Sequence, residues 1–282
     1  MLRSMYSGIS GMKNFQVKLD VIGNNIANVN TYGFKKGRTT FKDLVSQQIA
    51  GATAPGTDRG GVNARQVGLG SQIASIDTVQ TQGSLQTTGR PLDLGISGDG
   101  FFIVGTGTAT APNMNFTRAG NFYLDKDGTL VNSDGLFVVG YPSTGGVVNT
   151  SQFGKIKIPT DAKSFSIGAN GVVNYVDGTG GLLQAGQIML AKFPNNEGLE
   201  KIGQNLYKNS ANSGPAPTAV GDLVIPGEEG AGSIVSSALE MSNVDLSEEF
   251  TEMIVAQRGF QANTRIITTS DEILQELVNL KR

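Results

Sequence analysis

The sequence predicts a mixed α+β protein, in which N- and C-terminal α-helices pair as a coiled-coil-like layer around an inserted antiparallel all-β domain. Three observations carry this prediction. Apolar residues recur at helical spacing at both ends of the chain, turn signals punctuate the middle, and the two ends have opposite net charge. With 282 residues, the chain is long enough for one or two domains with a sizeable core.

The first expected element is a helix over residues 2–29. Its large apolar residues recur at steps of three and four, as on one narrow stripe of a helix. The members of this stripe are Leu2, Met5, Ile9, Met12, Phe15, Leu19, Ile22, Ile26 and Val29. Residues 28–33 then contain Asn and Gly, which accept a positive φ and so predict the end of the helix.

The second expected helix begins near Leu246 and runs almost to the C-terminus. Its stripe consists of Leu246, Phe250, Met253, Gln257, Phe260, Thr264, Ile267, Asp271, Leu274 and Val278. A narrow stripe held for about five heptads is typical of a coiled coil. We call the two stripes together the assembly seam. Ser242–Asn243 or Ser247 is expected to cap this helix, and Glu248 and Glu249 complement its positive end.

Three polar residues lie inside the C-terminal stripe. Gln257, Thr264 and Asp271 recur every seven residues. A polar residue at a seam position specifies register or partner at a cost in stability, which is one interpretation. The other is that the seam drifts towards a neighbouring apolar track formed by Ile266, Ile273, Leu277 and Leu280.

The middle of the chain is expected to be β-structure. Turn signals stand at residues 125–128 and 132–135 and at Asn170–Gly171, between short β-prone runs. This pattern favours an antiparallel sandwich or barrel-like domain. Open loops are expected at 51–61 and 209–221. The predicted organisation is a helical assembly domain (1–34 and 242–282), extended connecting segments (35–90 and 226–241) and a β-rich outer domain (91–225).

The charges of the two ends are complementary. Residues 1–45 contain seven Lys/Arg and two Asp/Glu, whereas residues 240–282 contain four Lys/Arg and eight Asp/Glu. Such a distribution favours packing of one end against the other. The basic run Lys35, Lys36 and Arg38 is predicted to be a solvated or partner-facing patch, because a net charge of −2 argues against nucleic-acid binding.

Composition excludes several kinds of chemistry. The chain has no Cys and no His, which excludes thiolate nucleophiles, Ser-His-Asp catalysis and the usual zinc sites. No glycine-rich stretch has the spacing of a phosphate-binding loop. We therefore expect no catalytic residue, no cofactor and no metal. The longest apolar runs are too short for membrane insertion, and the N-terminus lacks the apolar region of a cleaved secretory signal.

Several segments resemble the bacterial flagellar axial family, the rod and hook proteins. At the N-terminus these are residues 7–12 (SGISGM), 19–28 (LDVIGNNIAN) and 31–35 (TYGFK). At the C-terminus they are 238–246 (ALEMSNVDL), 253–258 (MIVAQR), 271–274 (DEIL) and 277–280 (LVNL). In the body, residues 93–102 (DLGISGDGFF) resemble the start of that family's β domain.

The resemblance implies a structural subunit that is not an enzyme. Such a subunit is exported through the flagellar type III apparatus without signal cleavage and polymerises outside the membrane into a hollow helical tube. The implied location is the extracellular hook or basal body. The implied partners are further copies of the chain, the distal rod, hook cap and hook–filament junction proteins, and the export apparatus.

Within the family, three features resemble hook protein more than rod protein. They are Tyr32 before Gly33, the triplet 140–142 (GYP) and residues 239–246. The expected function is therefore that of a hook subunit, of the compact form found in Gram-positive bacteria, which forms a flexible universal joint transmitting motor torque to the filament. The alternative is the distal rod protein, a driveshaft of similar size. From another class, a secreted β-rich hydrolase or adhesin stays open, and a convergent carboxylate pair in a cleft would favour the hydrolase.

Overall fold

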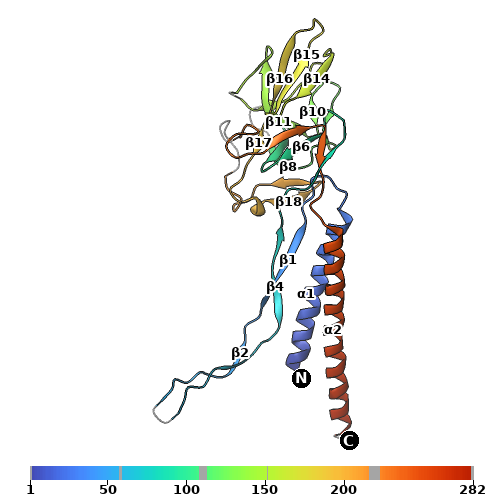
Figure 1. The fold of residues 1–282 in the computed structure, drawn as a ribbon. Coiled ribbons are helices and arrows are strands. Elements are labelled where there is room, and N and C mark those ends of the chain that lie inside the picture. The colour runs from blue at the N-terminus through green and yellow to red at the C-terminus, as the bar shows by residue number, and fades with distance from the viewer. Residues whose placement is uncertain (1, 57–58, 108–112, 151, 216–222, 281–282) are drawn as a thin grey trace. The chain divides into compact units, whose positions relative to one another are not determined.

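The computed structural model describes residues 2–56, 59–107, 113–150, 152–215 and 223–280. Within these ranges the protein is a mixed α+β structure with two α-helices and many antiparallel strands (Figure 1). The helices are α1 (Leu2–Ala27) and α2 (Leu246–Asn279), with a short 3-10 helix at Asn196–Gly198.

The strands are short, and some successive strands pair antiparallel through a tight turn, as β14 with β15 and β18 with β19 do. Their bounds are β1 (Gly37–Asp43), β2 (Gln47–Ala50), β3 (Arg65–Val67), β4 (Ser71–Thr78), β5 (Leu85–Thr87), β6 (Leu94–Ser97), β7 (Phe101–Thr106), β8 (Asn113–Thr117), β9 (Tyr123–Leu124), β10 (Leu130–Val131), β11 (Phe137–Thr144), β12 (Val147–Val148), β13 (Gly154–Lys155), β14 (Ser164–Ile167), β15 (Val172–Val176), β16 (Leu182–Ile188), β17 (Leu190–Ala191), β18 (Glu200–Gly203), β19 (Leu206–Lys208), β20 (Ser233–Ser236) and β21 (Ala238–Glu240).

Both terminal helices form where the apolar spacing predicts them. The cap of α2 differs from the expectation. Asp245 is the N-cap, and its carboxylate accepts hydrogen bonds from the backbone N–H groups of Ser247 and Glu248. The predicted caps at Ser242–Asn243 or Ser247 were wrong, because Asn243 instead donates to the carbonyl of Val79 and accepts from the N–H of Lys36.

The chain divides into two compact units. The helix unit contains Met1–Ala27, Gly37–Thr78 and Asp245–Arg282, and the β unit contains Asn28–Lys36 and Val79–Val244. The predicted domain limits stay predictions.

In the helix unit, α1 packs against a two-stranded ribbon as well as against α2. Strands β1 and β4 pair antiparallel, with a bulge between Thr40 and Phe41. Asn14 Nδ2 of α1 donates to Ser71 Oγ at 2.8 Å, and the rings of Phe15 and Phe41 meet edge to face at 6.1 Å. The ribbon continues into the β2–β3 hairpin, drawn as a long arm in Figure 1.

The β unit is built on an antiparallel sheet with the strand order β14-β15-β16-β11-β7-β8-β19-β18. Two smaller pairs, β6 with β20 and β5 with β21, join segments far apart in the sequence. Strand β7 is buried on both faces, because alternate side chains point to opposite sides of a sheet. Phe102 and Val104 join one hydrophobic cluster, whereas Phe101 and Ile103 join the other.

The predicted turns lie between strands. Gly128, Gly135 and Gly171 all have φ close to +78°, which L-residues with a side chain rarely adopt. They follow β9, β10 and β14, so the turn chemistry of the sequence placed these connections correctly. Of the two expected loops, residues 57–58 and 216–221 lie outside the described residues. The remainder of 51–61 forms the tip of the β2–β3 hairpin, closed by a bridge between Thr53 and Val62.

Candidate assembly surface

The apolar stripe of α1 is largely covered within the helix unit. Ile22 is buried, and Ile9 is 37% exposed. The remaining described members within α1 are half-buried, namely Met5, Met12, Phe15, Leu19 and Ile26. Val29 follows α1, belongs to the β unit and is also half-buried. The side chain of Leu2 lies outside the described residues.

The stripe of α2 is mostly open to solvent. Met253, Ile267 and Leu274 are half-buried. The exposed members are Leu246, Phe250, Gln257, Phe260, Thr264, Asp271 and Val278. The buried residues of α2 are instead Glu249, Ala256 and Ser270. The buried face of α2 is therefore rotated relative to the predicted stripe.

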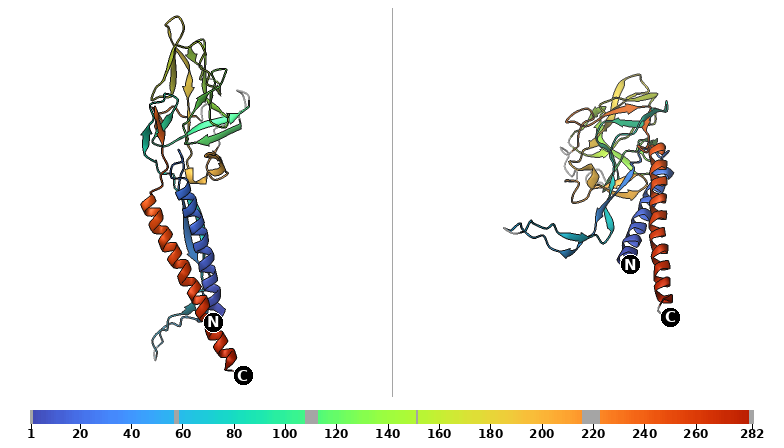
Figure 2. Two further views of the ribbon diagram at one scale, coloured as in Figure 1. Left: turned by 90° about the vertical axis from the view of Figure 1, so that its right-hand side faces the viewer. Right: turned by 60° about the horizontal axis from the view of Figure 1, so that its bottom comes forward.

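Small and polar residues form the contact between α1 and α2, which lie side by side in Figures 1 and 2. A Cβ added to Gly259 would lie 2.5 Å from the ring of Phe15, so the helices approach closely at this glycine. Asn25 Nδ2 donates to the buried Glu249 Oε2 at 3.1 Å. Glu249 therefore has a second role besides complementing the helix dipole.

The opposite charges of the two ends meet in an ion pair of the helix unit, between Lys18 and Glu252. Lys18 Nζ lies 3.1 Å from Glu252 Oε2, and both side chains keep some contact with water. A pair of this kind contributes about 0–1 kcal/mol. This ion pair therefore affects the relative orientation of α1 and α2 more than the stability of their contact.

The burial of these side chains does not distinguish the two interpretations of the polar heptad positions, register specification and drift of the seam. Gln257, Thr264 and Asp271 are exposed, but so are Ile266, Ile273, Leu277 and Leu280 of the neighbouring track. Thr264 does reach α1, with its Oγ1 3.3 Å from Met12 Sδ. Ile254 and Val255 extend this exposed apolar surface, at 59% and 58% exposure. Several exposed apolar side chains on one helix are typical of a surface that contacts another protein.

The β2–β3 arm is a second exposed apolar region of the helix unit. Every residue of β2 and β3 is exposed. Among the apolar side chains of the arm and its base, Val45 is 82% exposed, Ile49 64% and Val62 51%. A two-stranded hairpin alone is marginally stable in water, so this arm gains from contact with another surface.

A buried ion network lies in the β unit, where the sequence predicted a solvated basic patch. That prediction was wrong for Lys35. Its side chain and that of Glu240 are both 0% exposed, and Lys35 Nζ donates to Glu240 Oε1 at 2.6 Å. Arg118 Nη1 donates to Glu240 Oε2 at 3.3 Å. Burial lowers the pKa of Lys35, and the Glu240 carboxylate opposes this effect.

The described residues offer no arrangement typical of a metal site. Within them no group of three or more Asp or Glu side chains could hold a metal ion. Asp127 and Asp161 do line one open hollow of the β unit, but both are exposed and share it with Lys126 and Lys157. An exposed, charge-balanced set lacks the burial that tunes catalytic carboxylates. Neither described helix is apolar enough over a sufficient length to cross a membrane.

Three family models match the chain. They are "Flagella basal body rod protein" at residues 5–35, "Flagellar hook protein FlgE/F/G D1 domain" at 95–175 and "Flagellar basal body rod FlgEFG protein C-terminal" at 235–280. The flagellar basal-body rod protein FlgG of Bacillus subtilis (strain 168) is 60% identical over 282 residues, and the match covers 100% of both chains. The chain belongs to the flagellar rod and hook protein family.

Two further members of the rod and hook family have lower identity to this chain. FlgG of Borreliella burgdorferi is 37% identical over 286 residues, and the hook protein FlgE of the same organism is 32% identical over 450, each match covering 100% of both chains. A solved hook protein, FlgE2 of Helicobacter pylori, is 22% identical, with a TM-score of 0.23 over 27% of this chain and 22% of that one. This is a family of structural flagellar components, not an enzyme family, so the chain is a structural component of the flagellar axis.

Proposed function

We propose that the protein is the distal rod subunit of the flagellum, a driveshaft that transmits motor torque. The observation that carries this proposal is the 60% identity to the rod protein FlgG of Bacillus subtilis along the whole of both chains. Three short motifs favoured the hook in the sequence analysis. The 60% identity to this rod protein extends over 282 residues and is therefore stronger support than the three motifs.

Chain length supports the same proposal. Rod proteins FlgG of Borreliella burgdorferi and Caulobacter vibrioides align over 286 and 283 residues. The hook proteins FlgE of Borreliella burgdorferi and Treponema pallidum require 450 and 472 aligned residues, although they too are matched over their full length. Those hook proteins therefore carry segments that this chain of 282 residues lacks.

Assembly would cover the surface that α2 leaves open. Phe250, Ile254 and Ile266 are between 45% and 59% exposed, and each buried methylene contributes about 0.8 kcal/mol. We propose that helices of neighbouring copies pack on this surface in a coiled-coil-like layer. The exposed apolar members of the C-terminal stripe would then join α2 to other subunits, while the face with Ala256 and Gly259 contacts its own α1.

The partners and location follow from this role. The neighbours are further copies of the chain and other axial proteins, with the hook following the distal rod and the cap and junction proteins acting beyond it. Export through the flagellar type III apparatus, without cleavage of a leader, would bring the subunit to the extracellular side of the membrane.

Complementation tests the choice between rod and hook. The gene is expressed in a Bacillus subtilis strain that lacks its FlgG, and in parallel in a strain that lacks the hook protein. We expect restored swimming and intact rods in electron micrographs of the first strain only. Rescue of the hook-deficient strain alone would replace the rod by the hook as the function of this chain.

A seam variant tests the role of the exposed face of α2. Phe250 is 49% exposed in the single chain, so Phe250→Ser is expected to change the free energy of unfolding by less than about 1 kcal/mol. It should nevertheless reduce polymer formation at least tenfold, measured by sedimentation of purified protein. The control is Glu272→Ala, an exposed residue of α2 outside the seam. Equal polymer yields from both variants would show that this stripe is not an assembly contact.

A further inference from the structure

The chain passes between the helix unit and the β unit four times. We call the peptide bonds at which it does so the four crossings, and in chain order they are Ala27–Asn28, Lys36–Gly37, Thr78–Val79 and Val244–Asp245. An asparagine lies close to a crossing in each unit. Asn25 stands shortly before the first crossing, and Asn243 stands shortly before the last.

In the helix unit, Asn25 joins the end of α1 to the starts of β1 and α2. Its side chain is 1% exposed. Its Oδ1 accepts from the backbone N–H of Gly37, and its Nδ2 donates to the carbonyl of the same residue, both at 2.9 Å. The amide thus bonds both backbone groups of Gly37, as a residue of a paired antiparallel strand would. Because Nδ2 also donates to Glu249 in the first turn of α2, this one side chain bonds residues beside three crossings.

In the β unit, Asn243 bonds a different set of residues beside the crossings. Its Oδ1 accepts from the backbone N–H of Lys36 at 2.8 Å. Its Nδ2 donates to the carbonyls of Val79 and Thr81 at 2.9 and 3.2 Å, and lies 2.9 Å from Thr81 Oγ1. The N–H of Val79 donates in turn to the carbonyl of Lys36 at 2.9 Å. The second, third and fourth crossings are therefore held on the side of the β unit.

The two asparagines bond consecutive residues of the second crossing. The N–H of Lys36 donates to Asn243, and the N–H of the next residue, Gly37, donates to Asn25. Each asparagine bonds residues of its own unit. The chain is thus held immediately before and immediately after it passes from one unit to the other.

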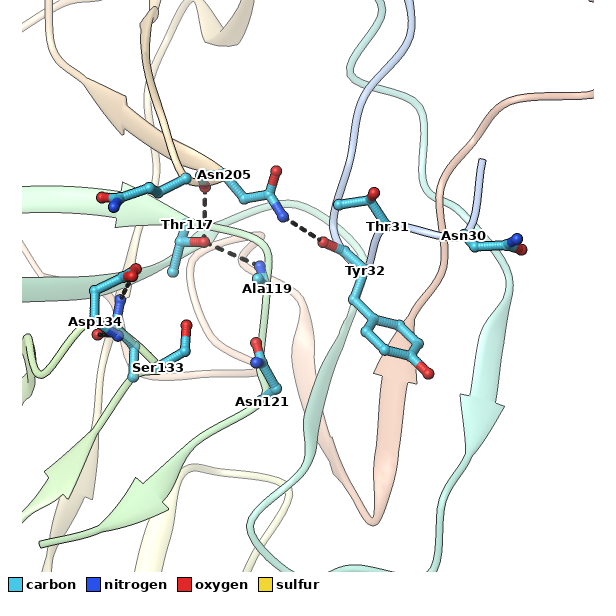
Figure 3. A pocket seen from close by; sticks show the side chains of 11 residues that line it. Asn30, Thr31, Tyr32, Thr117, Ala119, Asn121, Ser133, Asp134 and Asn205 are labelled. Carbon is cyan, nitrogen blue, oxygen red and sulfur yellow. Dashed lines mark hydrogen bonds between the residues drawn. The ribbon is translucent and has the colours of Figure 1, made fainter. Parts of the chain in front are cut away.

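The segment between the first two crossings, residues 28–36, is also anchored along its length. Asn205 Nδ2 donates to the carbonyl of Tyr32 at 3.1 Å (Figure 3). The N–H of Gly33 donates to the carbonyl of Glu240 at 2.8 Å. The bonds at Lys36 therefore end a segment that is already fixed within the β unit.

Both positions require an amide rather than a carboxylate. An amide both donates and accepts, whereas an ionised carboxylate only accepts. A carboxylate at position 243 would face the carbonyl oxygens of Val79 and Thr81, and one at position 25 would face the carboxylate of Glu249. Aspartate has nearly the size of asparagine, so it removes these donors with little change in packing.

We propose that Asn25 and Asn243 are two latches that hold the segments at the four crossings together. Asn25 secures the first, second and fourth crossings, and Asn243 secures the second, third and fourth. A force on one crossing segment is then shared with the others, instead of peeling that segment from its unit. This inference rests on the role of the chain as a structural component of the flagellar axis, and it holds for a rod or a hook subunit alike.

Limited trypsin digestion of the purified full chain tests the latches. Trypsin cleaves after Lys35, Lys36 and Arg38, which surround the second crossing, and cleavage of a folded protein follows the population of locally opened chain. Asn25→Asp and Asn243→Asp are each expected to speed cleavage at these sites about tenfold. The control is Asn30→Asp, an exposed asparagine of the segment 28–36, which should change the rate by less than about twofold.

Hydrogen exchange distinguishes a latch from a general contribution to stability. The N–H groups of Lys36, Gly37 and Val79 should exchange about tenfold faster in the two latch variants, whereas that of the buried Val104 in β7 should keep its rate. Equal acceleration at Val104 would overturn the proposal, because the asparagines would then only stabilise the fold. Cleavage of either latch variant no faster than Asn30→Asp, or rapid cleavage of the unchanged protein at residues 35–38, would overturn it as well.

Discussion

At the residue scale, the buried carboxylate of Glu240 is fixed by three partners within the β unit. Its carboxylate lies between Lys35 and Arg118 and also accepts from the backbone N–H of Gly83 at 3.0 Å. Arg118 donates further to the carbonyl of Gly98 and stacks over the ring of Phe101 at 5.1 Å. One carboxylate thus neutralises two buried cations that come from distant parts of the chain.

Glu240→Gln is predicted to destabilise the β unit strongly. The substitution leaves two buried cations without a counter-charge, and breaking a buried ion pair in this way costs about 3–5 kcal/mol. Denaturation in urea, followed by far-UV circular dichroism, measures the change. The matched control is Glu228→Gln, an exposed carboxylate in a loop, which should shift the free energy of unfolding by less than about 0.5 kcal/mol. A similar small shift for both variants would contradict the network.

The burial of Tyr207 predicts that the free energy of unfolding decreases above pH 10. Burial raises the pKa of its phenol above the ordinary value of 10.0. In the unfolded chain the phenol ionises from about pH 10 upward while the folded chain stays protonated, so unfolding is favoured by about 1.4 kcal/mol for each pH unit above 10 until the folded pKa is reached. Below pH 10 this contribution is fully present.

The Tyr207→Phe variant should lose this dependence. Its free energy of unfolding is expected to fall less steeply than that of the unchanged protein between pH 10 and pH 11, measured by urea denaturation at both values. Parallel curves for the two proteins would show that the Tyr207 phenol is solvated when folded.

At the element scale, the contact between α1 and α2 depends on small residues that an apolar stripe does not reveal. Ala256 and Ser270 are buried, and Gly259 lets the Phe15 ring approach the backbone of α2. The spacing of large apolar residues instead identifies the predicted C-terminal stripe, because Phe250 and Phe260 are its largest members. The predicted seam therefore describes what α2 leaves exposed more than what it buries.

Gly259→Ala is predicted to weaken the helix pair despite its higher helix propensity. Alanine favours a helix by about 1 kcal/mol over glycine, but its Cβ would lie 2.5–2.9 Å from the Phe15 ring, and overpacking costs about 1–3 kcal/mol. Gly23→Ala is the control, because nothing lies within 4 Å of the added Cβ. Thermal loss of the helical signal should occur at lower temperature for Gly259→Ala and at higher temperature for Gly23→Ala. A rise for both would argue against a close contact at Gly259.

At the scale of the whole molecule, the β unit is predicted to fold alone if its returning segments are retained. The carbonyl of Lys36 accepts from the N–H of Val79 at 2.9 Å, so a short Gly-Ser linker can replace residues 37–78. A protein of residues 28–36, linker and 79–244 should be a folded monomer by sedimentation and circular dichroism.

The shorter fragment 91–225 should be markedly less stable. It lacks β20, the partner of β6, and with it the buried Ile234, and it also lacks Lys35 and Glu240. Equal free energies of unfolding for the two proteins would show that β20, β21 and the ion network contribute nothing to the β unit.

The sequence by itself determined the elements whose signals are local. Apolar spacing placed α1 and α2, and glycines able to adopt positive φ placed the turns after β9, β10 and β14. Only the tertiary structure decided the contact face of α2 and the burial of Lys35, whose partner Glu240 lies 205 residues away. The physical reason is that a lysine beside other basic residues has the same local pattern whether water or a distant carboxylate neutralises it. Packing of the intervening chain decides between the two.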